Sequence, residues 1–395
     1  MSWVSESSDQ GATGAPLKVV HYSPVWLEIT QTWLYNQLRY LPPDIENHVV
    51  CRSTRNLDSF RVDNIHCLKR DRRDLYVLSK LLWALGLKSY NGFMANCVAR
   101  IKPDLIHSHF GNNGWMNLAV AARHKLPHVV TFYGQDVSML PRQEPVWRDR
   151  YRHLFQAERT LFLCEGSHMA QCLVDMGCPA DKVKLHHLGV EVDRIEYLPR
   201  TWAPGEPLRV LIAGSFREKK GIPYALEALG LLKDRYPLEI TIIGDAGSQD
   251  EKAQILEVIA RHGLGDRTRL LGYQPHGVLF AEAHGHHLFL SPSVTAASGD
   301  TEGGAPVSII EMAASGMPIV SSFHCDIPEV IRHGKTGWLA EERNVEQIVE
   351  AICRWLERPE SWAEMLGAGR RHIETEYAVL GQAARLAAHY RDLVS

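Results

Sequence analysis

Short apolar runs rich in β-forming residues alternate along the chain with longer stretches of helical periodicity. This alternation is typical of parallel α/β layers, in which a helix returns the chain to the start of the next strand. In the first half the predicted strands are Leu17–Tyr22, Asp104–His109, His128–Phe132, Thr160–Cys164 and Val183–His187. In the second half they are Leu208–Ala213, Leu238–Ile243, Thr268–Leu271, His287–Leu290 and Met317–Ser321.

A proline-rich segment, Pro199–Pro207, lies near mid-chain and is the best linker candidate. The sequence therefore predicts two Rossmann-like halves, residues 17–200 and 201–375. Residues 376–395 are predicted as a C-terminal helix that packs back on the N-terminal half. Residues 1–16 are small and polar, so we expect a disordered tail.

Length and composition agree with two soluble domains. A chain of 395 residues exceeds what one hydrophobic core usually organises. The net charge of −3 gives no reason to expect nucleic acid as a partner. The eight cysteines contain no C-x-x-C pair, which favours reduced thiols in a cytoplasmic protein. No apolar run approaches the roughly 20 residues that span a bilayer.

Two common nucleotide motifs fail on their spacing. The dinucleotide fingerprint G-x-G-x-x-G follows none of the predicted strands. The segment Gly334–Thr336 looks like the end of a P-loop, but Glu329 stands where that motif needs glycine.

The first candidate phosphate site follows the opening strand of the second half. There, Ala213–Gly221 is a strand end with Gly214 followed by a basic loop, and a helix is predicted to begin near Ile222 and Pro223. This arrangement places cations at the edge of the sheet where open α/β folds bind ligands. Arg217 and Lys220 are therefore suited to a diphosphate; the alternative is an ordinary solvated loop.

The second candidate segment is Asp300–Pro318. Pro306 fits the first turn of a helix and Gly316 its C-cap. Gly303 and Gly304 leave backbone N–H groups unobstructed before that helix, which predicts an anion cradle at its N-terminus.

Two acids flank this cradle. Glu302 lies in the loop and Glu311 about one and a half turns into the helix. Glu302 could hold the hydroxyls of a sugar ring and Glu311 those of a ribose. In the alternative, structural interpretation, Glu311 caps a neighbouring strand and Glu302 is exposed.

At these residues the sequence resembles the retaining GT-B glycosyltransferases with an E-x7-E motif, glycosyltransferase family 4, group 1. The likeness is closest to the branch that makes colanic acid, amylovoran and other exopolysaccharides. Ser321–Leu339, Asp104–Gly111 and Thr131–Val137 are similar to segments of that branch. The resemblance runs from about residue 17 to the end, and it implies two Rossmann-like domains facing a central cleft.

The resemblance implies that Lys220 binds the donor diphosphate, Glu302 the transferred sugar and Glu311 the ribose. The full set of implied donor-binding residues is Gly214, Ser215, Arg217, Lys220, Glu302, Gly303, Gly304, Ala305, Pro306, Val307 and Glu311.

The sequence departs from the family pattern in three places. Eight residues separate Glu302 from Glu311, so a one-residue bulge is expected at the two glycines. Ser215 stands where the family has a phosphate-binding arginine, which Arg217 could replace. Tyr133 occupies the position of a histidine in many members, which weakens the assignment of a catalytic histidine there.

No Asp-x-Asp pair occurs in the sequence, so a metal-independent reaction without a cofactor is predicted. Lys220, Arg217 and the helix start would stabilise the leaving diphosphate. The resemblance implies retention, with the leaving phosphate helping to deprotonate the acceptor. On the acceptor side the candidates are His109, Tyr133, Gln135 and Asp136, with Asp136 as a catalytic base; a structural role is equally open.

Two further clusters lie outside these segments. His284, His286 and His287 lack the ligand spacing of a zinc site, so packing or surface roles are favoured. Lys69–Arg73 precedes the apolar stretch Leu75–Leu87, which would permit peripheral contact with an anionic inner membrane. An amphipathic helix packed on the N-terminal sheet is the favoured alternative.

Together these features predict a glycosyltransferase that moves a hexose-type sugar from a nucleotide-diphosphate sugar to a saccharide or lipid-linked saccharide. Two alternatives stay open. One is another GT-B enzyme, an epimerase or a phosphorylase. The other is a non-catalytic sugar-nucleotide sensor, against which the cluster of Lys220, Glu302 and Glu311 argues.

Overall fold

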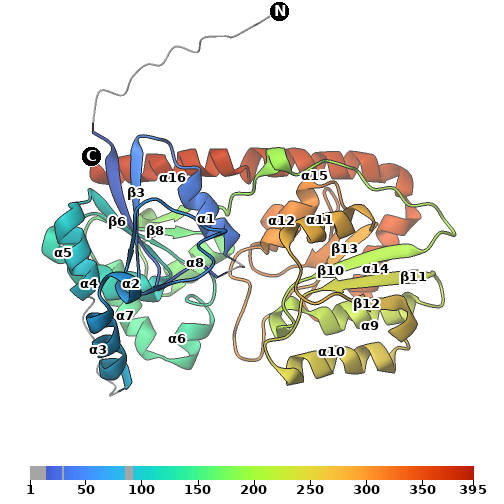
Figure 1. Ribbon diagram of the computed structural model, residues 1–395. Helices are drawn as coiled ribbons and strands as arrows, with labels where there is room; N and C mark the ends of the chain where they lie inside the picture. The colour runs from blue at the N-terminus through green and yellow to red at the C-terminus, as the bar shows by residue number, and fades with distance from the viewer. Residues whose placement is uncertain (1–14, 29–30, 85–91) are drawn as a thin grey trace, which may run out of the picture.

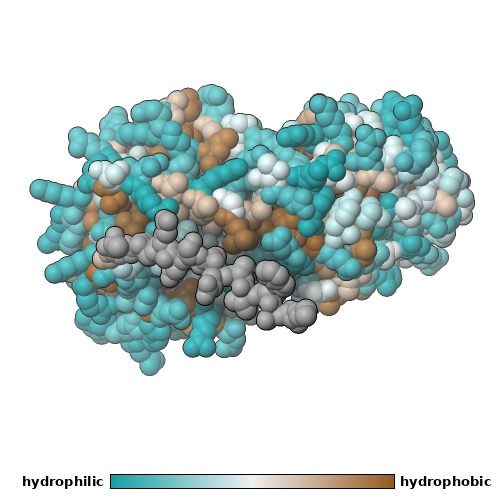
Figure 2. Space-filling model, turned by 90° about the horizontal axis from the view of Figure 1, so that it is seen from above, coloured by the Kyte–Doolittle hydropathy of each residue, from teal (hydrophilic) through white to brown (hydrophobic). Residues whose placement is uncertain are grey.

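The computed structural model describes residues 15–28, 31–84 and 92–395, with side chains omitted for 82–84. It contains two α/β halves, each built on a parallel sheet, side by side (Figure 1). This arrangement confirms the predicted fold class. Seen from above, the surface shows two lobes with an indentation between them (Figure 2). Residues 1–14, most of the predicted disordered tail, lie outside the described residues.

The N-terminal half contains a seven-stranded sheet in the order β5-β3-β1-β6-β7-β8-β9, with every pairing parallel. A small separate pair joins β2 to β4. The bounds are β1 Leu17–Tyr22, β2 Val25–Trp26, β3 Ile45–Cys51, β4 Ser53–Thr54, β5 Ile65–Cys67, β6 Leu105–His109, β7 His128–Thr131, β8 Thr160–Cys164 and β9 Val183–Leu185.

The C-terminal half contains a six-stranded parallel sheet in the order β12-β11-β10-β13-β14-β15. Its strands are β10 Leu208–Ala213, β11 Leu238–Ile243, β12 Thr268–Leu270, β13 Leu288–Ser291, β14 Ile319–Ser322 and β15 Trp338–Ala340. The strand order reverses direction between β10 and β13, and such a switch point is where open α/β sheets bind ligands.

Helices cover both sheets (Figure 1). In the N-terminal half they are α1 Thr32–Arg39, α2 Leu68–Asp71, α3 Arg73–Ala84, α4 Gly92–Ile101, α5 Gly111–His124, α6 Met139–Gln143, α7 Val146–Phe155 and α8 Ser167–Asp175. After the linker come α9 Ile222–Leu232, α10 Gln249–Arg261, α11 His276–His284, α12 Val307–Ala314, α13 Ile327–Val330, α14 Val345–Glu357, α15 Trp362–Glu376 and α16 Val379–Val394.

Strand β10 lies in the middle of its sheet and contains the apolar run 210–213. Val210 and Ile212 pack into one hydrophobic cluster with Leu226 of α9. Leu211, which points to the other face, packs in a second cluster with Ile309 of α12. Because both faces are buried at residues 210–212, these positions need apolar side chains in succession rather than an alternating pattern.

The chain crosses between the halves a second time at its C-terminal end. Helix α15 packs on the C-terminal half, and α16 runs on over the N-terminal half (Figure 1). Leu386, Ala387 and Tyr390 of α16 lie in one hydrophobic cluster with Val19 and Leu105 of the N-terminal sheet. These α16 residues are therefore part of the core of the N-terminal half.

Helix α3 differs from the favoured interpretation of its sequence. Val77, Leu78 and Leu81 are 51%, 49% and 57% exposed, so this apolar face does not pack on the N-terminal sheet. The end of the predicted segment, residues 85–87, lies outside the described residues. Across the described part of the chain, no helix combines the length and apolar character required to cross a membrane.

Candidate active site

The candidate site lies where two loops of the C-terminal half meet. One loop follows β10 and contains the 3₁₀ turn Glu218–Lys220 before α9. The other follows β13 and runs to α12. Because β10 and β13 are adjacent parallel strands, their carboxyl ends lie at the same edge of the sheet and bring both loops together.

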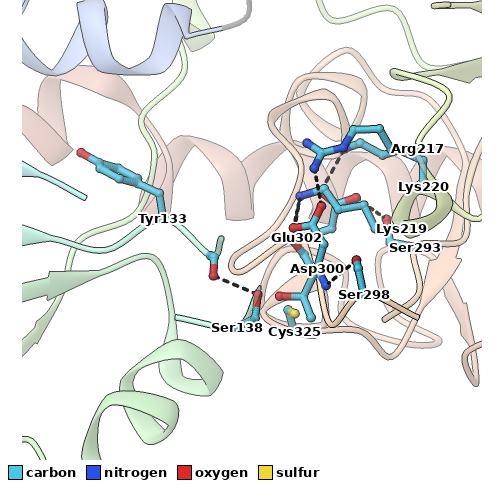
Figure 3. A network of polar contacts seen from close by, with 12 residues as sticks. Tyr133, Ser138, Arg217, Lys219, Lys220, Ser293, Ser298, Asp300, Glu302 and Cys325 are labelled. Carbon is cyan, nitrogen blue, oxygen red and sulfur yellow. Dashed lines mark hydrogen bonds and ion pairs between the residues drawn. The ribbon is translucent and has the colours of Figure 1, made fainter. Parts of the chain in front are cut away.

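Three cations from the first loop contact two acids of the second (Figure 3). Lys220 Nζ lies 2.9 Å from Glu302 Oε2. Arg217 lies 2.5 Å from Asp300 Oδ2, and Lys219 lies 3.3 Å from Asp300 Oδ1. Glu218 of the same turn adds a third acid, and its Oε2 accepts a hydrogen bond from the backbone N–H of Ala297 at 2.9 Å. Three cations gathered at one sheet edge suit an anionic ligand.

Glu302 is buried and ionised. Its side chain is 6% exposed. Burial alone would raise the pKa of Glu302, but the charges of Lys220 and Lys219 outweigh burial and hold this pKa below its ordinary value. The second carboxylate oxygen accepts a hydrogen bond from the Ser293 hydroxyl at 2.9 Å. Both oxygens of the acid predicted to contact the sugar are thus engaged by protein groups.

The two glycines after Glu302 touch the N-terminal half. Gly303 has a φ of +82°, which a residue with a side chain rarely adopts, and it lies where the extra residue of the motif is expected. A Cβ added to Gly303 would lie 2.2 Å from Gly134 Cα, and one added to Gly304 would lie 1.9 Å from Glu165 Oε2. Only glycine at these positions lets the two halves approach so closely.

Helix α12 carries Glu311 as the sequence predicts. Pro306 is the N-cap rather than the first helical residue, and Gly316 follows the helix with a φ of +78°. Glu311 is 8% exposed, and its Oε1 lies 2.9 Å from Nε2 of His276 on α11. The hydrogen bond to Glu311 raises the pKa of His276, although burial opposes it.

Glu311 borders a cavity of about 370 Å³ between the two halves. The lining comes from α1, from the segment before the linker and from α11 and α12. The residues are Thr32, Trp33, Tyr35, Asn36, Arg39, Ser59, Phe60, Gly189, Val190, Glu191, Arg194, Ile195, His276, Phe280, Val307 and Glu311. Aromatic rings beside charged and polar side chains, including Glu191 and Glu311, are typical of a small-molecule site.

Asp136 on the acceptor side holds the backbone of its own half. Its two oxygens accept hydrogen bonds from the backbone N–H groups of Gly111 at 2.6 Å and Tyr133 at 3.0 Å. Burial raises the pKa of Asp136 to about 6, although these bonds oppose the rise. Gln135 is exposed and lines, with Asp136, a separate cavity of about 360 Å³. The role of Asp136 as a base stays a prediction.

His109 and Tyr133 belong to a buried hydrogen-bonded chain. His109 Nδ1 lies 2.7 Å from the Tyr133 hydroxyl, and His109 Nε2 lies 3.2 Å from Nδ1 of His21. His21 Nε2 in turn lies 3.0 Å from Oδ1 of Asn47. The Tyr133 ring points away from Glu302, so this chain leads into the N-terminal core (Figure 3).

The structure brings together a histidine triple that differs from the one in the sequence analysis. His21, His107 and His109 have ring nitrogens within 4.8 Å of one another, all buried. Each ring already has hydrogen-bond partners in the protein, including Tyr390 for His107. His286 and His287 contact Thr241 and Arg209, roles in packing. The prediction of a metal-free reaction is not tested by this geometry.

Sequence reasoning missed four residues of this site. Lys219 and Ser293 lie in the predicted loops but were not selected, because a second lysine and a small polar residue carry little signal. His276 and Glu165 come from segments with no motif. Glu165 does follow the predicted strand Thr160–Cys164, and its position at a strand end was the available signal.

Comparison with known proteins gives consistent matches. The family "Glycosyltransferase Family 4" matches residues 30–194, and the family "Glycosyl transferases group 1" matches residues 193–372. The amylovoran biosynthesis glycosyltransferase AmsK of Erwinia amylovora is 36% identical over 63% of this chain and 60% of its own length. This match spans less than two thirds of that relative.

Two further comparisons agree. The putative colanic acid biosynthesis glycosyltransferase WcaL of Escherichia coli is 29% identical over 74% of each chain. Among solved structures, HepE of Anabaena in complex with UDP superposes with a TM-score of 0.77, covering 95% of this chain and 100% of that one at 14% identity. At this identity the structural match establishes the fold alone.

Proposed function

The chain belongs to the group 1 and family 4 glycosyltransferases, and from this premise we propose that it transfers a hexose-type sugar from a nucleotide-diphosphate sugar to a hydroxyl group. The proposed acceptor is a saccharide or a lipid-linked saccharide. The proposed setting is exopolysaccharide biosynthesis, because the amylovoran and colanic acid relatives carry that role in their names.

The observation that carries the proposal is the meeting of Arg217, Lys219 and Lys220 with the loop before α12. A sugar nucleotide leaves as a diphosphate, so negative charge builds on its phosphate oxygens. The three cations and the start of α12 would stabilise this charge. In the proposed reaction the anomeric carbon loses its bond to phosphate and gains one to the acceptor oxygen.

The nucleoside is proposed to occupy the cavity beside Glu311. A carboxylate can accept two hydrogen bonds from the vicinal hydroxyls of ribose. The aromatic rings of Trp33, Phe60 and Phe280 on the cavity wall would face the base. UDP in the complex of the Anabaena neighbour supports a nucleotide donor and makes uridine the first base to try.

We also propose that the reaction retains configuration and needs no metal. The acceptor proton would then pass to the leaving diphosphate, and protein cations would replace the metal. Activity measured with EDTA in excess of all divalent ions tests this proposal. Full activity is expected, and strong inhibition that Mg²⁺ or Mn²⁺ reverses would contradict it.

Helix α3 supports a proposed peripheral contact with the inner face of an anionic membrane, which would place the protein in the cytoplasm. Its exposed Val77, Leu78 and Leu81 follow the basic segment Lys69–Arg73, and apolar residues beside lysine and arginine suit the headgroup boundary. Sedimentation with phosphatidylglycerol vesicles tests this contact. Vesicles of phosphatidylcholine alone are the control and should bind less protein.

The experiment that tests the donor proposal is a thermal-shift screen with UDP-, GDP-, ADP- and dTDP-sugars. One family of nucleotides should raise Tm, because a ligand that binds only the folded state stabilises it. Absence of any shift with all four, together with absence of donor hydrolysis, would reject a sugar-nucleotide site.

A further inference from the structure

The carboxylates around the contact between the two halves differ in how they are satisfied. Asp136 accepts two backbone hydrogen bonds, and Asp300 is paired with Arg217 and Lys219. Glu302 is held by Lys220 and Ser293. Asp326 accepts one hydrogen bond through Oδ1, from the backbone of His168, and its Oδ2 is buried without a partner. Each of these acids has a partner within the protein.

Glu165 has none among the described residues. It follows β8 in the N-terminal half. Its side chain contacts Gly304, which lies in the loop between β13 and α12, and a Cβ added to Gly304 would lie 1.9 Å from its Oε2. The residue is only 8% exposed. Unlike Oδ2 of Asp326, the carboxylate oxygens of Glu165 are not among the fully buried atoms that lack a partner, so solvent reaches them. A ligand bound at the contact between the halves could therefore hydrogen-bond to them.

The charges around Glu165 indicate what that partner is. Burial raises the pKa of Glu165 well above its ordinary value, and the negative charges of Asp326, Asp136 and Glu302 act in the same direction. Lys219 opposes them. A group with a raised pKa keeps its proton to higher pH, and it can then donate a hydrogen bond as well as accept one. A neutral hydroxyl can both donate to and accept from it and carries no repelling charge.

We propose that Glu165 is a further sugar-binding residue, supplied by the N-terminal half, which hydrogen-bonds a hydroxyl of the sugar being transferred. This inference rests on the proposed function. The position of Glu165 against Gly304, two residues from Glu302, places it beside the loop proposed to hold the donor. Glu302 is bonded to protein groups through both oxygens, whereas the carboxyl group of Glu165 has no hydrogen bond or ion pair with another described residue.

The inference separates binding of the sugar from binding of the nucleotide. Calorimetric titration would compare the nucleotide-sugar that gives the largest thermal shift with its free nucleoside diphosphate. The variants are Glu165→Ala and the isosteric Glu165→Gln. Glu158→Gln is the matched control, because Glu158 is exposed and lies before β8.

Glu165→Ala should weaken binding of the nucleotide-sugar by about 10- to 100-fold, which is the loss expected for a hydrogen bond to an acid group. Affinity for the nucleoside diphosphate should change by less than about 2-fold on the same scale. Glu165→Gln can still hydrogen-bond a hydroxyl, so it should lose less. The control should match the wild type with both ligands.

Equal losses for both ligands, or no loss for the nucleotide-sugar, would overturn the role of Glu165. Equal losses would mean that Glu165 only supports the contact between the halves. If the wild type binds neither ligand, the proposed function itself fails, and the inference fails with it. Glu165→Gln should keep the Tm of the unliganded protein at or above the wild-type value, because it removes an acid whose ionised form burial and the nearby negative charges disfavour.

Discussion

The ammonium nitrogen of Lys220 lies 2.9 Å from Oε2 of Glu302, across the loops that follow β10 and β13. The resemblance assigns both residues to the donor, yet in the structure they bind each other. Lys220 therefore helps to hold the pKa of Glu302 below its ordinary value, and each side chain fixes the position of the other. A donor would have to share Lys220 with Glu302 or displace this pair, so both residues belong in the same test.

Lys220→Ala should abolish transfer and weaken binding of the nucleoside diphosphate. It removes the closest cation of Glu302, and breaking a buried ion pair costs on the order of 3 kcal/mol. Initial rates, calorimetry and urea unfolding measure the three effects. Lys335→Ala, at an exposed lysine, is the control. Wild-type activity of Lys220→Ala would reject the site.

The pair of His276 and Glu311 should give a pH-dependent stability. The pKa of His276 is raised above 6.5 in the folded protein, chiefly by its hydrogen bond to Glu311. The stabilisation is therefore complete below about pH 6.5 and disappears as pH rises through the folded-state pKa. Glu311→Gln should reduce this dependence, as seen in Tm from pH 5.5 to 8.5. An NMR titration of His276 that is unchanged in Glu311→Gln would contradict the coupling.

Asp326, at the contact between the halves, should make the stability of the protein depend on pH. Burial raises its pKa to about 7, although the hydrogen bond from the His168 backbone at 2.7 Å opposes the rise. Because the folded state holds this proton more tightly than the unfolded state, stability falls as pH rises from about 4 to 7. Asp326→Asn should remove this fall in stability. Relative to the wild type, the variant should therefore be more stable at pH 8 than at pH 5. Parallel Tm curves for both proteins would argue against the shift.

Gly304→Ala should separate the two halves where the loop before α12 contacts Glu165. The new Cβ would overlap Glu165, so the loop or the acid must move, at a cost of about 1–3 kcal/mol. Gly277→Ala in α11 is the matched control, because a Cβ there meets no atom within 4 Å. The transfer rate and the free energy of unfolding measured in urea should both fall for Gly304→Ala. Both should stay at the wild-type value for Gly277→Ala. Crystals of Gly304→Ala with Glu165 in place would contradict this account.

The sequence predicted four strands with the bounds that the structure has. β1, β8, β10 and β11 have the predicted bounds, since each is buried on both faces. β3 was missed because Glu46, Asn47 and His48 interrupt its apolar residues. The interruption has a structural reason, since Asn47 and His48 hydrogen-bond to His21 and His66.

For the site, the sequence located the loops but not the partnerships within them. Lys220 and Glu302 were both selected, yet their ion pair depends on β10 lying beside β13, which strand spacing along the chain does not reveal. Asp136 was selected as an acid in the acceptor segment, and its two backbone hydrogen bonds became visible only in the fold. Glu165 belongs to no motif, and its place beside the site is evident only from its contact with Gly304 in the opposite half.

The crossing of α16 has a consequence for how the protein is made. Tyr390 bonds His107, 283 residues earlier in the chain, and its ring is buried in the first half of the molecule. During synthesis the first half emerges long before Tyr390 is added to the chain. The apolar face of its sheet that α16 covers therefore stays exposed until the end of synthesis. The C-terminal half can complete its own core first. The N-terminal half therefore finishes last, although it is translated first.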